Sequence, residues 1–204
     1  MSLAEAGAKV RQLTERFKAG DTDSVNAFRD LLAFVLGQTV LDDSGAVRVV
    51  SGPRPESWLI GGWNPHTPDP LPLTNGHFLR LYVKLFRQSC EDKTHRLKVE
   101  ASAYQYQLDK AGENWTFRYD YIRDPNNEYP ASHVQIRGTL TADVLDQGRT
   151  LERVHFPTRR MSIESIIRLL IQDFKVPPKT DASFWRPLLE ESLRSFHEIA
   201  HETL

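Results

Sequence analysis

The feature that most constrains the fold of this chain is a change of hydrophobic period to two between Leu79 and Arg137. Apolar and polar residues alternate in four consecutive runs, at 79–85, 96–103, 115–121 and 133–137. Because successive side chains of a strand point to opposite faces of a sheet, each run indicates a strand with one buried and one wet face. The second run is expected to bury Leu97, Val99, Ala101 and Ala103. Short polar links predict an antiparallel meander, which residues 153–156 extend by a short fifth strand.

Helical spacing replaces this alternation near the N-terminus. Apolar residues recur at helical intervals through residues 3–19, and a second apolar stripe follows Ser24, which is a suitable helix cap. Gly37 closes the second stripe. Residues 1–37 are therefore predicted to form a helical hairpin.

Two more helices are expected within residues 162–204. Ser162 is a suitable N-cap for a helix over 163–174, and two prolines that follow stop this helix. The last helix is expected from about Pro187 to the C-terminus. Both have an apolar side that can pack on the predicted sheet.

A proline-rich segment, residues 51–75, precedes the alternating runs. Its prolines are Pro53, Pro55, Pro65, Pro68, Pro70 and Pro72. We expect an irregular connection, because proline cannot donate a backbone hydrogen bond. Trp58 and Trp63 either anchor a packed loop that crosses the fold or belong to a lid or partner-binding loop.

No boundary divides the chain sharply, so we interpret residues 1–204 as one domain. The predicted fold is α+β, with a four- or five-stranded antiparallel meander sheet at residues 77–156. Helices pack on one face of this sheet, from the N-terminal hairpin and from the C-terminal segment.

The composition limits the classes of function. The chain has 204 residues, 40% hydrophobic and 26% charged, which is enough to bury a full core and unlike a disordered chain. The formal net charge of −1 gives no overall basic field for nucleic acid or anionic membrane, and leaves local basic patches open. The single cysteine, Cys90, can form neither an internal disulfide nor a cysteine-based zinc site.

The sequence shows neither a secretory signal nor a membrane span. Its first residues form a charged amphipathic pattern where a signal peptide has an apolar core. The densest apolar stretch, residues 163–171, contains Glu164 and Arg168 and is too short to cross a bilayer. We therefore expect a cytoplasmic protein without a membrane partner.

The most specific short motif is H-E-x-x-H at residues 197–201. On a helix it places His197 and His201 on one side, where they can share a zinc ion, with Glu198 as general base. Only Glu202, Thr203 and Leu204 follow in this sequence, so we expect no third ligand after the pair. We predict no metal and no other cofactor, and a zinc site at His197 and His201 is the alternative.

A polar group on the predicted sheet is the first candidate for catalysis. Pairing of the strands around 116–122 and 133–137 brings together Arg118, Asp120, His133, Gln135 and Arg137. Cations with a histidine can bind phosphates and move protons without a metal, so Arg118, Asp120, His133 and Arg137 are the catalytic candidates. The alternative is an ordinary wet sheet face with charged cross-strand pairs.

A second candidate site directly precedes the predicted helix at Ser162. His155, Arg159 and Arg160 run into a helix N-terminus whose first N–H groups have no partner within the helix. With Ser162 and the helix dipole, these residues predict an anion-binding site. The alternative is a capped helix whose arginines face solvent.

Three motifs follow one another along the chain: Arg-Tyr-Asp at 118–120, a histidine-containing strand at 133–137, and Ser-x-Glu at 162–164. From about Leu79 to Phe174, this order resembles the TumE-like family of bacterial toxins. The resemblance implies a toxin that acts on RNA and is neutralised by a protein antitoxin.

The chain also departs from that family. It has His133 and Gln135 where those proteins have a His-x-His pair, and it adds the N-terminal hairpin and the long C-terminal helix. Residues 129–135 are similar to uncharacterised actinobacterial proteins as well, and this second resemblance implies no activity.

Three functions therefore compete. The first is a metal-independent toxin-like protein that acts on RNA, and the second is a non-catalytic module that binds a protein partner through the Trp58/Trp63 segment or the last helix. The third is a zinc hydrolase. Near-neutral charge favours the second, because affinity for nucleic acid comes mainly from phosphate neutralisation, and the toxin resemblance favours the first.

Overall fold

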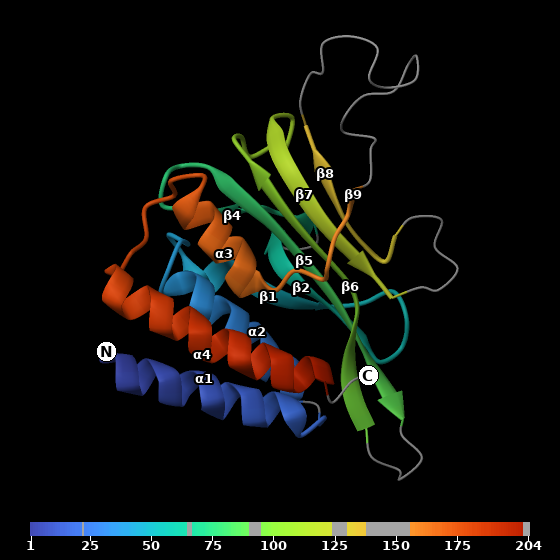
Figure 1. Cartoon of the computed structure of the whole chain (residues 1–204). Helices are drawn as coiled ribbons and strands as arrows, with labels where there is room; N and C mark the ends of the chain where they lie inside the picture. Colours follow the sequence, from blue (N-terminus) through green and yellow to red (C-terminus); the bar gives the residue numbers. More distant parts are fainter. Residues whose placement is uncertain (22, 65–66, 90–94, 124–129, 138–155, 202–204) are drawn as a thin grey trace, which may run out of the picture.

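Helices cover one face of a twisted antiparallel sheet (Figure 1). The computed structural model describes residues 1–21, 23–64, 67–89, 95–123, 130–137 and 156–201, without the side chains of 156–157 and 199–201. The helices are α1 (Leu3–Lys18), α2 (Ser24–Gly37), the short 3₁₀ helix η1 (Ser44–Ala46), α3 (Ile163–Gln172) and α4 (Ala182–His201). The strands are β1 (Val47–Ser51), β2 (Ser57–Asn64), β3 (Thr67–Pro68), β4 (Leu71–Pro72), β5 (Phe78–Ser89), β6 (His95–Gln107), β7 (Trp115–Ile122), β8 (Ser132–Ile136) and β9 (Phe156–Pro157). The predicted α+β class is confirmed.

The sheet has the order β1-β2-β5-β6-β7-β8-β9, with β3 paired to β2 and β4 paired to β5. Strands β5 to β8 follow one another as an antiparallel meander, as the alternating runs predict. The expected four or five strands are too few, since the described residues form a 9-stranded sheet. Of the predicted strand at 153–156, the structure describes only its last residue, which begins β9.

The proline-rich segment 51–75 is the largest correction to the predicted fold. Its middle part is strand β2, which pairs with β1 on one side and β5 on the other. Residues 57–64 contain no proline. The described prolines lie in the turn before β2, in the two-residue strands β3 and β4, and in the link between these strands. Proline is tolerated at such margins because no ladder hydrogen bond is required there.

Two glycines let β2 approach its neighbours closely. A Cβ atom on Gly61 would lie 2.1 Å from the backbone oxygen of Leu81, and one on Gly62 would lie 2.0 Å from that of Asp69. Neither position has room for a side chain. These two glycines are therefore required by strand packing.

A bulge in β6 changes which side chains face the helices. Lys84 lies opposite Ala101, whereas Leu85 lies opposite Val99, so Glu100 is the extra residue. The expectation that Ala101 and Ala103 share the buried face with Leu97 and Val99 is therefore wrong. Beyond the bulge, Ser102 and Tyr104 take the helix side and the two alanines face the other way.

The predicted helices are present with shifted ends. Ser162 caps α3, since its Oγ accepts the backbone N–H of Ser165 at 3.2 Å. Helix α3 ends at Gln172 instead of Phe174. Helix α4 begins at Ala182, so that Pro187 lies inside it and not at its start. Helices α1 and α2 pack against each other, and α4 packs on α1, α2 and α3 (Figure 1).

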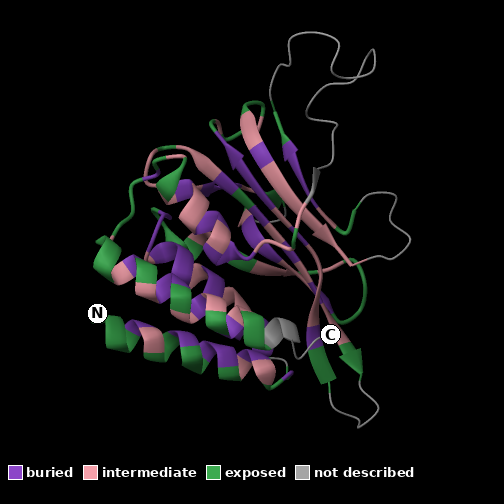
Figure 2. Ribbon diagram, in the orientation of Figure 1, coloured by how far each residue is buried: buried purple, intermediate pink, exposed green. Residues whose placement is uncertain are grey.

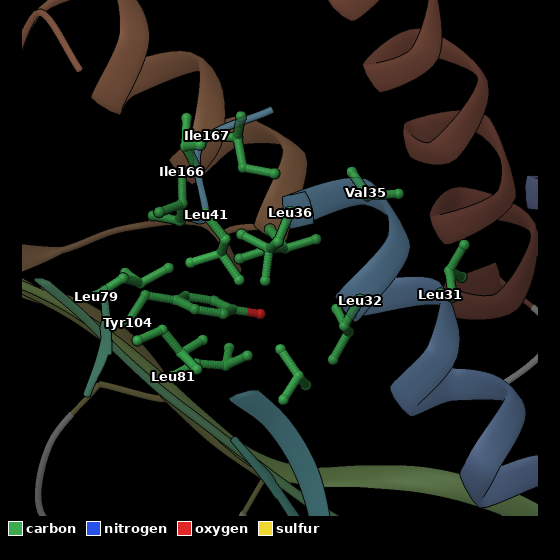
Figure 3. Close-up of a cluster of buried hydrophobic side chains, with 14 of the residues drawn as sticks. Leu31, Leu32, Val35, Leu36, Leu41, Leu79, Leu81, Tyr104, Ile166 and Ile167 are labelled. Atoms are coloured by element: carbon green, nitrogen blue, oxygen red, sulfur yellow. The ribbon is translucent and has the colours of Figure 1, made fainter. Parts of the chain in front are cut away.

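The hydrophobic core lies between the helices and the sheet face that they cover (Figures 2 and 3). Leu36, Leu79 and Ile166 are fully buried there. The ring of Tyr104 extends among them with its hydroxyl directed toward α2 (Figure 3). Burial raises the pKa of Tyr104 to about 12, so this phenol stays neutral at physiological pH. Among the described helices, none combines the length and the apolar character that crossing a membrane requires.

Candidate functional site

The face of the sheet opposite the helices, which we call the open face, is the candidate functional site. Strand pairing defines it, because directly paired residues point to the same side. One row across the sheet, from β1 to β8, consists of Arg48, Gly61, Tyr82, Ala103, Asp120 and His133. The neighbouring rows on this face contain Lys84 with Ala101, and Arg118 with Gln135.

Basic side chains outnumber acidic ones on the open face. Its strands contribute Arg48, Arg80, Lys84, Arg96, Lys98 and Arg118, against the carboxylates of Glu100 and Asp120. Arg48, Arg80 and Lys98 form no ion pair with any residue that the structure describes. The whole chain has a formal net charge of −1, so positive charge is concentrated on this face.

A groove of about 990 Å³ lies on the open face. The small side chains of Ala101 and Ala103 leave room at its centre, and Tyr82 and Phe86 line it from β5. Burial raises the pKa of Tyr82, and the charge of Glu100 raises it further. The groove therefore offers neutral aromatic rings between charged side chains.

The acids of the groove are held by cations. Glu100, the bulge residue, has its Oε2 3.0 Å from Lys84 Nζ and in contact with Arg54 of the β1–β2 turn. At the rim, Arg87 Nη1 lies 2.9 Å from Glu56 Oε1. The single carboxylate of Glu100 is shared by two cations, which leaves positive charge in excess beside it.

Three of the predicted catalytic residues form a line next to this groove. Arg118 Nε donates to Asp120 Oδ2 at 2.7 Å, and His133 Nε2 lies 3.7 Å from the same oxygen. His133 Nδ1 is 3.0 Å from the backbone oxygen of Pro130. Both ring nitrogens thus face protein groups, and His133 is only 3% exposed. The position fits a support that orients Asp120 better than a base that reaches substrate.

The fourth predicted catalytic residue, Arg137, is exposed and follows directly after β8. Its backbone N–H donates to the carbonyl of Thr116 at 2.9 Å. The structure therefore brings Arg118, Asp120 and His133 into contact, with Arg137 farther along. The catalytic role of all four stays a prediction.

The structure describes three of the four residues of the predicted anion site, and their side chains have different surroundings. Arg159 is exposed, whereas the Arg160 guanidinium carbon lies 4.6 Å from the ring centroid of Tyr121 and 5.2 Å from that of Phe196. Ser162 is buried as the cap of α3, and His155 lies outside the described residues. Arg160 is thus directed toward two aromatic rings, and the anion site stays a prediction.

The histidines of the H-E-x-x-H motif are described in part. His197 is exposed, and its ring centroid is 5.7 Å from that of Phe196. The side chain of His201 lies outside the described residues, so the zinc alternative is not tested. In the described part of the chain, no three His, Cys, Asp or Glu side chains gather as a metal site would require.

The tryptophans of the proline-rich segment belong to strand β2, so their assignment to a loop or lid is wrong. Trp58 pairs with Leu85 and faces the helix side. The indole Nε1 of Trp63 is buried and has no hydrogen-bond partner among the described residues.

Sequence reasoning misses the residues that line the groove. The alternation identifies Tyr82 and Lys84 only as solvent-facing positions of a strand. The prolines place Arg54 in an irregular connection. The available signal is that basic residues repeat at the wet positions of the runs at 79–85 and 96–103. Comparison with known protein families, curated proteins and solved structures finds no match to this chain.

Proposed function

We propose that this protein binds single-stranded RNA on the open face of its sheet. The observation that carries the proposal is the concentration of basic side chains and partly exposed aromatic rings on one face of a chain with a net charge of −1. Neutralisation of phosphates supplies most of the sequence-independent affinity for nucleic acid. Aromatic rings on such a surface can stack on unpaired bases.

The arrangement along β5 suits a single strand. Tyr82 and Phe86 project from the same side of the strand with Lys84 between them. At about 3.3 Å per residue, the two rings lie roughly 13 Å apart, so each would stack on a different base. Lys84 would then contact the phosphates between these two bases, and Arg80, on the other side of Tyr82, would contact a phosphate beyond them.

We propose RNA as the ligand, and not DNA, because the chain resembles the TumE-like toxins. A toxin-like protein that acts on RNA would use this face, and a protein antitoxin would inhibit it by covering the same face. Because His133 is buried, the described geometry supports binding of RNA more directly than cleavage.

Fluorescence anisotropy with a labelled single-stranded RNA, titrated at several salt concentrations, tests the proposal. Replacing Arg80 and Lys98 by alanine should weaken binding across sequences. It should also lower the salt slope by about 1.4, since each phosphate contact to a single strand contributes about 0.7. The matched control is Lys9→Ala with Arg186→Ala, which removes the same charge from exposed positions on the helices and should leave both quantities unchanged.

Two results would contradict the proposal. One is the absence of salt-dependent RNA binding by the wild type, which would favour a protein-binding module. The other is an equal loss in the helix control, which would mean that total charge and not the open face sets the affinity. Single-stranded DNA of the same sequence tests the preference for RNA, and slowed bacterial growth on expression tests the toxin-like role.

A further inference from the structure

A second, smaller pocket, which we call the inner pocket, lies between the helices and the covered face of the sheet. Its volume is about 40 Å³. One water molecule needs roughly 10–15 Å³, and a drug-sized ligand needs about 300 Å³ or more. Most of the lining is apolar and includes Phe28, Leu31, Leu32, Val83 and Phe196. The size and the lining suit a small molecule with a short apolar part.

Two arginines make one end of the inner pocket positive. Arg160 and Arg123 both line it, and neither forms an ion pair with a residue that the structure describes. Arg123 Nε donates to the backbone oxygen of Val99 at 3.0 Å. Burial lowers the pKa of the Arg160 guanidinium, whereas Tyr104 and Tyr121 act to raise it, and the nearby charge of Arg123 acts to lower it. An anion bound beside these two cations would relieve their repulsion.

Glu164 adds an unpartnered polar atom to the same pocket. The residue is 4% exposed, and its Oε1 accepts a hydrogen bond from Ser192 Oγ at 2.5 Å. Its Oε2 is buried without a partner among the described residues. Burial raises the pKa of Glu164, against the opposing effect of the Ser192 hydrogen bond. A protonated carboxyl would donate one hydrogen bond from Oε2 to an oxygen in the pocket.

We propose that the inner pocket binds a short-chain carboxylate, with the carboxylate group on Arg160 and Glu164 and the alkyl chain among the apolar side chains. Planar guanidinium groups pair with carboxylates through two parallel hydrogen bonds, which favours this head group. A phosphate ion would have no apolar part to place against Leu31 and Val83. The proposal does not depend on RNA binding, because Arg160 and Glu164 line the inner pocket and not the groove of the open face.

Titration of the full-length protein with acetate, butyrate, octanoate, butan-1-ol and inorganic phosphate tests the site, with heat of binding and thermal stabilisation as readouts. Butyrate should bind more tightly than acetate, because it fills more of the apolar space, and octanoate should bind less tightly than butyrate because it exceeds that space. Butan-1-ol and phosphate should each bind at least tenfold more weakly. Equal binding of phosphate, or of the alcohol, would overturn the proposal, and so would affinity that keeps rising up to octanoate.

The neighbouring arginines provide matched variants. Arg160→Gln should lower the affinity for butyrate at least tenfold, whereas Arg159→Gln removes the same charge from an exposed position and should change it less than twofold. If Arg160→Gln and Arg159→Gln lowered the affinity for butyrate equally, Arg160 would not be the residue that binds the carboxylate group.

Because Arg160 also packs on aromatic rings, its replacement can impair folding, and a measurement on the wild type avoids this. Nuclear Overhauser contacts are expected between the butyrate methyl group and the methyl groups of Leu31 and Val83. Their absence under saturating butyrate would overturn the site, whatever the RNA experiment shows.

Discussion

The two faces of the sheet are built from the same strands, yet they carry different properties. On β5, Leu79, Leu81 and Val83 are buried under the helices, while Arg80, Tyr82 and Lys84 occupy the open face. The covered face encloses the core and one small pocket, and the open face carries a groove and an excess of positive charge. Along one strand, the buried residues are therefore expected to set stability, and the alternate residues on the open face are expected to set binding. Substitutions at the two sets of positions can test these two properties separately.

The largest expected difference is in stability. Leu79→Ala should lower the free energy of unfolding by about 2–5 kcal/mol, because it leaves a cavity in a fully buried part of the core. Its neighbour Arg80 is exposed and forms no described ion pair, so Arg80→Ala should stay within about 0.5 kcal/mol of wild type. Urea denaturation measures both. Comparable losses would mean that the open face also supports the fold.

The aromatic rings of the open face should affect binding more than stability. Tyr82→Ala and Phe86→Ala should each weaken RNA binding by about 1–3 kcal/mol, the usual contribution of one stacked base. Tyr82→Phe keeps the ring and should bind almost as the wild type does. Fluorescence anisotropy gives these affinities. If Tyr82→Phe lost as much as Tyr82→Ala, the hydroxyl and not stacking would be the important group.

On the covered face, stability should depend on pH through Glu164. Because its pKa is raised by burial, the folded protein holds this proton more tightly than the unfolded chain does. The resulting stabilisation is complete below the ordinary pKa of 4.5 and is lost as the pH rises through the folded value. Glu164→Gln has no charge to bury and no proton to take up, so at neutral pH it should be more stable than wild type, by up to about 1.4 kcal/mol for each unit by which the pKa of Glu164 is raised. Urea denaturation at several pH values measures this gain, and parallel pH profiles for the two proteins would contradict it.

The smallest expected effect is a gain of affinity on the open face. Glu100→Gln removes the carboxylate that occupies Arg54 and Lys84, which frees these cations for phosphates. RNA binding should strengthen by about 0.2–1 kcal/mol, the range for partly exposed charge pairs. Glu190→Gln on α4 makes the same charge change at an exposed position and should have no effect. Salt titrations of both variants separate the local effect from the change in net charge.

Much of the fold was predictable because hydrophobic alternation and helix capping depend on residues that are close together in the sequence. Alternation of apolar and polar residues identifies β5 to β8, and the N-cap at Ser162 follows from residue type and position. That Arg118, Asp120, His133 and Gln135 share one face follows from the alternation in two neighbouring strands, whereas the register decides which of them lie opposite each other. Strand β2 could not be found in this way, because the prolines around residues 57–64 obscure a short run that contains none.

By itself, the sequence determined which residues alternate, that a helix begins after Ser162, and that Arg118, Asp120 and His133 share one side of the sheet. Only the tertiary structure decided that Glu100 is a bulge residue, that His133 is buried, and that Arg160 is directed toward Tyr121 and Phe196. The physical reason is that alternation and capping depend on adjacent residues. Burial and strand register depend instead on contacts between segments far apart in the chain, and one inserted residue in β6 reverses the face of every position beyond it.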